Sequence, residues 1–250
     1  MNALDGIRVL DLSRVLAGPW STQILADLGA DVVKVERLGT GDDTRGWGPP
    51  FLHDAQGNDT AEAAYYLGTN RNKRSMTCDI AKPLGQDLIR SLALNSHVFI
   101  ENFKVGDMAR YGLDYVSLQA INPRLVYCSI TGFGQTGPYS ERAGYDFAVQ
   151  AMGGLMSVTG ERDAVGGSPQ KVGVAVADLF TGMYATVAIL AAIRHAERTA
   201  VGQYIDMALL DTQVAMLANL GANYLVNGAQ FPPPQRMGNA HVNIVPYQVF

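Results

Sequence analysis

The chain has 250 residues, of which 48% are hydrophobic and 17% are charged, and its formal net charge is -4. This composition predicts a globular protein with one large domain, or one domain plus part of another. The negative balance argues against a nucleic-acid partner, which needs a basic surface. The only cysteines, Cys78 and Cys128, form no CxxC motif and suit a reducing cytoplasm, and the four histidines are too scattered for a zinc site.

The N-terminus and the apolar segments give no sign of a membrane protein. Residues 1–12, MNALDGIRVLDL, enter a strand-like pattern directly, without the features of a signal peptide. The longest uncharged apolar segment, MYATVAILAAI at 183–193, is far shorter than the roughly 20 residues that cross a bilayer. We therefore expect a cytoplasmic protein that does not associate with membranes.

The first 37 residues predict a βαβ unit. Apolar, β-branched runs at 7–13 and 31–37 flank a helical stretch at 20–29, as in buried parallel strands joined by a helix. Pro19 suits the first turn of this helix, and Gly29 suits its C-terminal end.

Helical and strand-like patterns alternate along the rest of the chain. The alternation predicts an α/β fold with an open, mostly parallel, Rossmann-like sheet flanked by helices. Residues 37–65 are rich in Gly, Pro and Asp and predict a long ordered loop without regular structure. The helical patterns lie at 82–95, 113–122, 144–158, 178–196 and 210–227, and the strand-like ones at 97–103, 124–130 and 202–209.

The last part of the chain predicts a domain boundary. Residues 231–236, FPPPQR, contain three consecutive prolines and indicate a stiff linker. We assign 1–228 to one large α/β domain, and 229–250 to the linker and the beginning of a small domain. The chain stops in a strand-like apolar run without a partner, so we expect the sequence to continue beyond Phe250.

The βαβ unit lacks a dinucleotide fingerprint. The turn after its first strand reads SRVLAGPWSTQ, with one glycine in place of G-x-G-x-x-G. Open parallel sheets still bind ligands beyond the carboxyl ends of their strands. A phosphorylated ligand there could be held by Arg37, Lys73 and Arg74, although the basic run NRNKRS at 70–75 could equally be a solvated loop.

Two further segments carry candidate site residues. Asn102 and Phe103 end a predicted strand, where they either face the same crevice or serve as a helix cap and a core residue. Asp178 is the single carboxylate in the apolar run VGVAVADLFTGMYA at 172–185. It is either the N-cap of the following helix or a reactive carboxylate, and both roles can coexist because a helix N-terminus favours the ionised form.

A series of motifs runs in order through almost the whole chain: LDGIRVLDLSRVLAGP, GADVVKVER, GDDTRGW, NRNKRSMTCD, ENFKVG, SITGFGQTGPYSERAGYDF and GVAVADLFTGMYA. Together they resemble the family III CoA-transferases, a family that includes formyl-CoA and carnitine CoA-transferases and α-methylacyl-CoA racemase. Within it, the chain looks most like the branch that moves CoA from succinyl-CoA to dicarboxylates such as glutarate.

The resemblance implies an acyl-CoA:carboxylate CoA-transferase with Asp178 as the catalytic carboxylate. Asp178 would attack the donor thioester and pass through an acyl-aspartyl anhydride and an aspartyl-CoA thioester. The other implied contacts are to CoA phosphate from Arg37, Lys73 and Arg74, to the CoA groove from Asn102, Phe103 and Arg110, and to the reacting acyl group from Tyr145 and Asp146.

The resemblance also implies substrates and partners. Acyl-CoA and a small carboxylic acid would be substrates, with no tightly bound cofactor and no metal, and the full-length protein would form an interlocked homodimer. A second carboxylate on the acceptor needs a cation, for which Arg14 and Arg142 are candidates. The alternatives are a racemase, in which histidine replaces Tyr145 as a base, and a CoA-binding fragment without chemistry.

Overall fold

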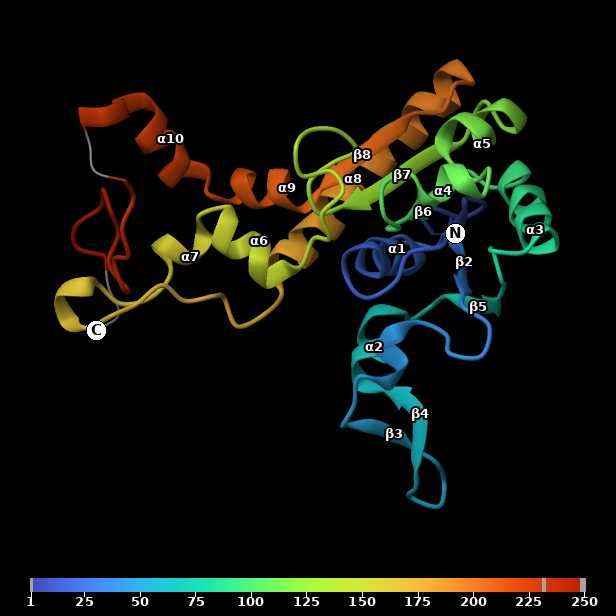
Figure 1. The fold of residues 1–250 in the computed structure, drawn as a ribbon, viewed down its shortest axis with the longest axis horizontal. Helices are drawn as coiled ribbons and strands as arrows, with labels where there is room; N and C mark the ends of the chain where they lie inside the picture. The colour runs from blue at the N-terminus through green and yellow to red at the C-terminus, as the bar shows by residue number, and fades with distance from the viewer. Residues whose placement is uncertain (1, 231–232, 248–250) are drawn as a thin grey trace.

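A six-stranded parallel sheet lies at the centre of the computed structural model, which describes residues 2–230 and 233–247 (Figure 1). Its strand order is β5-β2-β1-β6-β7-β8, and every neighbouring pair is parallel. This arrangement confirms the expected α/β class. The strands are β1 (Arg8–Asp11), β2 (Asp31–Glu36), β5 (Arg74–Thr77), β6 (Val98–Glu101), β7 (Val126–Thr131) and β8 (Tyr204–Ala208).

Helices cover both faces of the sheet and make two hydrophobic cores. Because side chains alternate along a strand, Val98 and Ile100 of β6 pack into one core and Phe99 packs into the other. The first core includes α1 (Ala17–Asp27) and α8 (Val176–Thr199), and the second includes α3 (Pro83–Leu94), α4 (Asp107–Arg110) and α5 (Tyr115–Ile121).

The helix expected at 20–29 is observed at Ala17–Asp27, and the two residues that marked its ends lie where they were expected. Pro19 lies in its first turn, and Gly29 follows its C-cap with a φ of +102°, a left-handed conformation that glycine adopts without strain.

Helix α8 is longer than the apolar segment in the sequence indicated. With 24 residues, it is the one described helix that is long and apolar enough to cross a membrane by those two criteria. Half of its most apolar window is buried, against the sheet and α1. Packing within the protein therefore accounts for much of its apolar character.

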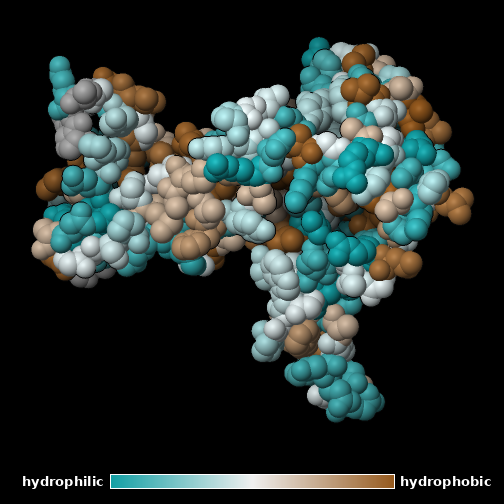
Figure 2. Space-filling view, in the orientation of Figure 1, coloured by the Kyte–Doolittle hydropathy of each residue, from teal (hydrophilic) through white to brown (hydrophobic). Residues whose placement is uncertain are grey.

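The segment 37–65 contains regular structure, contrary to the expected loop. After a 3-10 turn at Asp43–Gly46, β3 (Phe51–His53) and β4 (Asp59–Ala63) pair as an antiparallel hairpin, and α2 (Ala64–Thr69) follows. The hairpin projects away from the sheet, and its tip is hydrophilic (Figures 1 and 2). Its short, largely exposed strands lack the apolar alternation that reveals a strand in a sequence.

Part of the second half of the chain, with the helical segments expected at 144–158 and 210–227, forms an arm that extends away from the sheet (Figure 1). The helix expected at 144–158 is divided into α6 (Asp146–Met152) and α7 (Leu155–Val158) by a glycine pair, of which Gly154 has a φ of +87°. The helix expected at 210–227 is also two helices, α9 (Leu209–Met216) and α10 (Ala218–Asn227).

The C-terminal segment packs against the loop after α7. Gly238 donates a backbone hydrogen bond to the carbonyl of Gly160 at 3.2 Å, and Arg236 Nε donates to the carbonyl of Glu161 at 3.0 Å. Residues 233–247 form turns and contain no strand. Part of the predicted linker, at 231–232, and the end of the strand-like run, at 248–250, lie outside the described residues, and the domain boundary at 228 stays a prediction.

The strand order places a topological switch point at β1. From β1 the chain runs outward to β2 and β5 and then returns to pair β6 on the other side of β1. Connections diverge to opposite faces of a sheet at such a point and leave a crevice at the carboxyl ends of the two strands. The segments after β1 and β6 are therefore where a ligand is expected.

Candidate active site

The loop after β1 is held in an unusual conformation by a residue that follows β6. The side-chain amide of Asn102 accepts a hydrogen bond from the backbone N–H of Arg14 at 3.0 Å and donates one to its carbonyl at 2.7 Å. The next residue, Val15, has a φ of +70°, which is rare for a β-branched residue. Strained backbone of this kind persists where its neighbours fix it and often lies at functional sites.

Asp178 lies in the first turn of α8 but does not cap it. The helix begins at Val176 with Ala175 as the N-cap residue, and no side chain of that residue caps it. The prediction that Asp178 is the N-cap is therefore wrong: it occupies the third helical position, where its own backbone N–H needs an acceptor.

Asp146, at the start of α6, supplies that acceptor. Its Oδ2 accepts the backbone N–H groups of Ala177 at 2.8 Å and Asp178 at 3.2 Å. Its Oδ1 accepts a hydrogen bond from Gln150 Nε2 at 2.6 Å. Asp146, which lies 32 positions before Asp178 in the sequence, therefore caps the N-terminus of α8.

The Asp178 carboxyl group resists ionisation. Burial raises its pKa, and the negative charge of Asp146 raises it further, to about 7. We expected the helix N-terminus to favour the charged form, and that contribution is outweighed. A carboxylate with a pKa near neutrality is more basic than an ordinary aspartate and still substantially ionised at pH 7.

Asp178 opens into a cavity of about 400 Å³ on one side of the switch point. Trp47 of the hairpin segment lines the cavity opposite α8 and stacks edge-on against Tyr65, with ring centroids 5.3 Å apart. Tyr145 lines the mouth with a 70% exposed side chain. Charged groups lining the cavity, besides Asp178, are Arg14, Asp43, Lys104, Glu141, Arg142 and Asp146.

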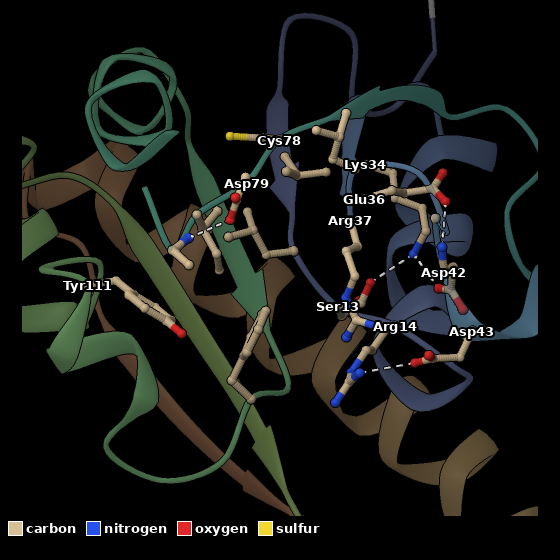
Figure 3. Close-up of a pocket in the computed structure, with 17 residues that line it drawn as sticks. Ser13, Arg14, Lys34, Glu36, Arg37, Asp42, Asp43, Cys78, Asp79 and Tyr111 are labelled. Carbon is tan, nitrogen blue, oxygen red and sulfur yellow. Dashed lines mark hydrogen bonds and ion pairs between the residues drawn. The ribbon is translucent and has the colours of Figure 1, made fainter. Parts of the chain in front are cut away.

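A second cavity, of about 460 Å³, lies between the carboxyl ends of β1 and β2 (Figure 3). Arg37 lines it with an exposed side chain that has no ion-pair or hydrogen-bond partner among the residues the structure describes. Phe103 and Tyr111 line the opposite side from Arg37. The site therefore offers an unneutralised guanidinium next to apolar and aromatic surface, which suits a phosphorylated ligand with a ring.

The two cavities share wall residues. Arg14, Asp43 and Phe103 line both of them, and Arg14 forms an ion pair with Asp43 at 3.0 Å (Figure 3). A long ligand can therefore lie with one end at Arg37 and the other at Asp178. An extended acyl thioester of a nucleotide has this form.

Three predicted phosphate or CoA contacts lie elsewhere. The Lys73 ammonium is buried and binds Asp11 Oδ2 at 3.2 Å, and burial lowers its pKa to about 8. Arg74 forms a bidentate pair with Asp31, and Arg110 pairs with Asp107 on the surface of α4. None of these three cations lines either cavity.

The buried charges instead fix the loops that surround the second cavity. Lys34 Nζ contacts Asp42 Oδ2 at 2.8 Å, and both side chains are almost fully buried. Glu36, the last residue of β2, accepts two hydrogen bonds from Arg45 at 2.7 Å. Burial opposes the ionisation of Glu36, but the bonds from Arg45 and Ser75 outweigh it and lower its pKa to about 2.

Asn102 and Phe103 line the crevice, which is one of the two alternatives that the sequence left open, and Phe103 also packs against the second core. The turn that carries them is held by Glu101, whose Oε2 accepts the backbone N–H of Phe103 at 2.7 Å. Burial raises the pKa of Glu101 to about 7.

The sequence reading missed Trp47 and Tyr65. Both come from the segment expected to be a loop, and an aromatic residue in such a segment carries no signal of what it faces. The motif GDDTRGW contained Trp47 and pointed to the segment but not to the cavity. Within the described ranges, no cluster of three or more His, Cys, Asp or Glu side chains could hold a metal ion.

The fold and the site together define an α/β protein with a buried carboxyl group in one of two adjoining cavities at the switch point of its sheet. The chain belongs to CoA-transferase family III, whose sequence pattern matches residues 4–250.

Named relatives agree with this membership. The chain is 59% identical over 246 residues to succinate–glutarate CoA-transferase of Agrobacterium fabrum, covering 98% of this chain and 60% of that protein. It is 48% identical over 247 residues to succinyl-CoA:glutarate CoA-transferase of Homo sapiens, covering 99% of this chain and 53% of that protein.

A solved structure shows the same fold. The crystal structure of a CaiB/BaiF family protein from Brucella suis has a TM-score of 0.90 and 56% sequence identity, covering 99% of this chain and 63% of that chain. The chain thus spans about three fifths or less of the length of these relatives.

Proposed function

We propose that this chain carries the CoA-binding groove and the nucleophile of an acyl-CoA:dicarboxylate CoA-transferase. The observation that carries the proposal is the position of Asp178, a carboxyl group with a pKa near 7 in a cavity that shares walls with the Arg37 cavity. The names of the relatives support succinyl-CoA as a donor and glutarate as an acceptor.

The reaction begins with the ionised Asp178. One carboxylate oxygen attacks the thioester carbonyl of the donor, the C–S bond breaks, and CoA leaves as a thiolate while an acyl-aspartyl anhydride forms. The thiolate then attacks the aspartyl carbonyl of this anhydride, which releases the donor acid as a carboxylate and leaves an aspartyl-CoA thioester.

The second half repeats these steps with the acceptor. Its carboxylate attacks the aspartyl thioester, CoA thiolate leaves, and the thiolate attacks the acceptor acyl carbon of the new anhydride. The products are acceptor acyl-CoA and the regenerated Asp178 carboxylate. No net proton or electron is consumed in this exchange, so it needs no oxidant or reductant.

Arg142 is the better of the two candidates for the distal carboxylate of a dicarboxylate. Arg14 is already neutralised by Asp43, whereas Arg142 stacks over Tyr139 at 4.1 Å and has no carboxylate partner in the described part of the chain. Both line the cavity of Asp178. We expect Arg142→Ala to raise KM for glutarate more than KM for a monocarboxylate of the same length.

The racemase alternative lacks its histidine base among the residues that the structure describes. No histidine lines the cavity of Asp178 among the residues described, and Tyr145 stands where the racemase pattern has one. A racemase would exchange the α-proton of its acyl-CoA substrate with solvent deuterium without any acceptor acid.

A transfer assay with labelled oxygen tests the proposal. The purified protein is incubated with succinyl-CoA and ¹⁸O-labelled glutarate, and the released acids are analysed by mass spectrometry. We expect glutaryl-CoA to form and ¹⁸O to pass through Asp178 into succinate. Tight CoA binding without acceptor-dependent exchange would indicate a CoA-binding protein without this chemistry, and acceptor-independent deuterium uptake would indicate a racemase.

We also propose a homodimer. An apolar stripe on α8 supports it, because Phe180, Met183, Tyr184 and Val187 follow helical spacing and are 44% to 62% exposed. Sedimentation of the wild type and of Val187→Glu tests this, and we expect the substitution to shift the protein toward monomer.

A further inference from the structure

The side chain of Asp146 makes its hydrogen bonds to the protein itself, two of them to the first turn of α8. Both of its oxygens are occupied by protein donors: Oδ2 by the N–H groups of Ala177 and Asp178, and Oδ1 by Gln150 Nε2. These contacts leave the carboxylate little capacity to bind an acyl group. Its position beside the cavity therefore needs another explanation.

Gln150 anchors this arrangement from inside the protein. Its side chain is fully buried, and while Nε2 donates to Asp146, Oε1 accepts the backbone N–H of Val172 at 2.9 Å. Gln150 thus ties Asp146 of α6 to the segment that leads into α8. Because Asp146 in turn holds the first turn of α8, the two residues fix the backbone from which the Asp178 side chain projects.

We propose that Asp146 is a positioning residue that fixes the first turn of α8 and thereby presents Asp178 to the groove, with Gln150 as its anchor. The inference rests on the proposed function, because it assigns Asp146 a role in the transfer reaction through Asp178. It replaces the expectation that Asp146 contacts the acyl group.

The negative charge of Asp146 also affects the ionisation of the Asp178 carboxyl group. The Asp146 charge lies against the N-terminus of α8, where it occupies the positive end of the helix dipole that would otherwise stabilise ionised Asp178. It also repels the Asp178 carboxylate, in addition to the effect of burial. The other titratable or charged groups facing Asp178 are Tyr65 of α2 and the cavity residues Arg14, Asp43, Lys104, Glu141, Arg142 and Tyr145.

Asp146→Asn removes the charge and keeps the acceptor for α8, at the loss of the bond from Gln150. The asparagine oxygen can still accept the N–H groups of Ala177 and Asp178, whereas its NH2 group cannot accept from Gln150 Nε2. We expect the acid limb of the pH profile of transfer to move down by about one pH unit, because only burial then raises the Asp178 pKa. We expect the affinity for CoA to stay within about twofold of wild type.

Asp146→Ala removes both the negative charge and the hydrogen-bond acceptors of this residue. It gives the loss of activity that Asp146→Asn should partly restore. Without an acceptor for the N–H groups of Ala177 and Asp178, the first turn of α8 frays, and we expect kcat to fall roughly 10- to 100-fold with little change in CoA affinity. Asp146→Asn should recover most of that loss. The matched control is Asp211→Asn, which removes an exposed acid from the first turn of α9 and should change neither kcat nor the pH profile.

The deciding measurement does not depend on turnover. The Asp178 carboxyl carbon is titrated by NMR in protein labelled with ¹³C-aspartate, with Asp178→Asn used to assign the signal. The inference predicts a midpoint near 7 in the wild type and in Asp211→Asn, and a lower midpoint in Asp146→Asn. An unchanged midpoint in Asp146→Asn overturns it, as does a rise in acceptor KM with an unchanged pH profile. If the wild type showed the expected midpoints but no transfer activity, the proposed transfer reaction would be wrong, whereas the electrostatic coupling between Asp146 and Asp178 would stand.

Discussion

Asp146 Oδ2 accepts the backbone N–H of Asp178 at 3.2 Å, while the charge on Asp146 opposes ionisation of the Asp178 side chain. One carboxylate therefore orients its neighbour and weakens its acidity at the same time. A nucleophile of this kind is reactive when ionised but is only partly ionised at neutral pH.

The first prediction concerns pH. Burial and Asp146 raise the Asp178 pKa to about 7, so the fraction of reactive carboxylate rises as the pH increases through that value. We expect kcat/KM for CoA transfer to increase about tenfold per pH unit below the midpoint and to level off above it. A profile that is flat between pH 5 and 8, measured with acceptors that are fully ionised throughout, would contradict this.

The second prediction concerns stability. Asp178 has a pKa near 3.8 when the chain is unfolded but near 7 in the folded state, so it stabilises the fold at low pH, and that contribution is lost as the pH rises from about 4 to 7. Asp178→Asn should therefore be more stable than wild type at pH 8, by about 2 to 4 kcal/mol. The gain should vanish below pH 4, as measured by urea unfolding at both pH values.

The third prediction concerns CoA binding. Arg37 faces the second cavity without a partner in the described ranges, so its removal costs a charge-assisted hydrogen bond to phosphate. Arg37→Ala should weaken CoA binding roughly 10- to 100-fold by calorimetry. Arg74→Ala is the matched control, because Arg74 is already paired with Asp31 outside both cavities, and it should bind CoA as wild type does. Equal losses in both variants would remove Arg37 from the site.

The fourth prediction concerns the loops around that cavity. Arg45 makes a bidentate pair with Glu36, whose side chain is only 1% exposed, and its removal leaves that carboxylate without its cation. Arg45→Ala should lower the free energy of unfolding by about 3 to 5 kcal/mol at pH 7.

The control for that variant is Arg194→Ala, which breaks an exposed pair with Glu197 and should cost less than about 1 kcal/mol. Part of the Arg45 effect should disappear near pH 2, where Glu36 itself becomes protonated. If the two variants lost similar amounts of unfolding free energy, the burial of Glu36 would not explain the effect of removing Arg45.

Five of the six strands of the sheet could be predicted from the sequence because they carry short apolar runs rich in β-branched residues. The sixth, β5, reads RSMT and is largely exposed, so no apolar pattern marked it. Runs such as that of β2 and β6 are buried on both faces and show this in their composition. Pro19 and Gly29 marked the ends of α1 through local backbone rules. The β3–β4 hairpin was not predicted because its strands are polar and largely exposed. Such strands lack the alternation of apolar and polar residues that a buried face produces.

The site could be predicted only in part, since charges find partners far away in the sequence. Lys73 and Arg74 are adjacent in the sequence and both are cationic. Lys73 nevertheless points into the protein and pairs with Asp11, 62 positions earlier, whereas Arg74 pairs with Asp31 on the surface. The capping of α8 by Asp146 likewise depends on a contact across 32 positions. Motifs identified Asp178 and Arg37, whereas only the folded chain shows which cations remain free to bind a ligand.

The central claim is that Asp178 becomes covalently linked during transfer. Protein mixed with succinyl-CoA, quenched within the first turnover and treated with hydroxylamine, should yield a hydroxamate at Asp178 in peptide mass spectra. The same treatment of Asp178→Asn should give none. Label on a different residue, or undiminished transfer by Asp178→Ala, would contradict the account.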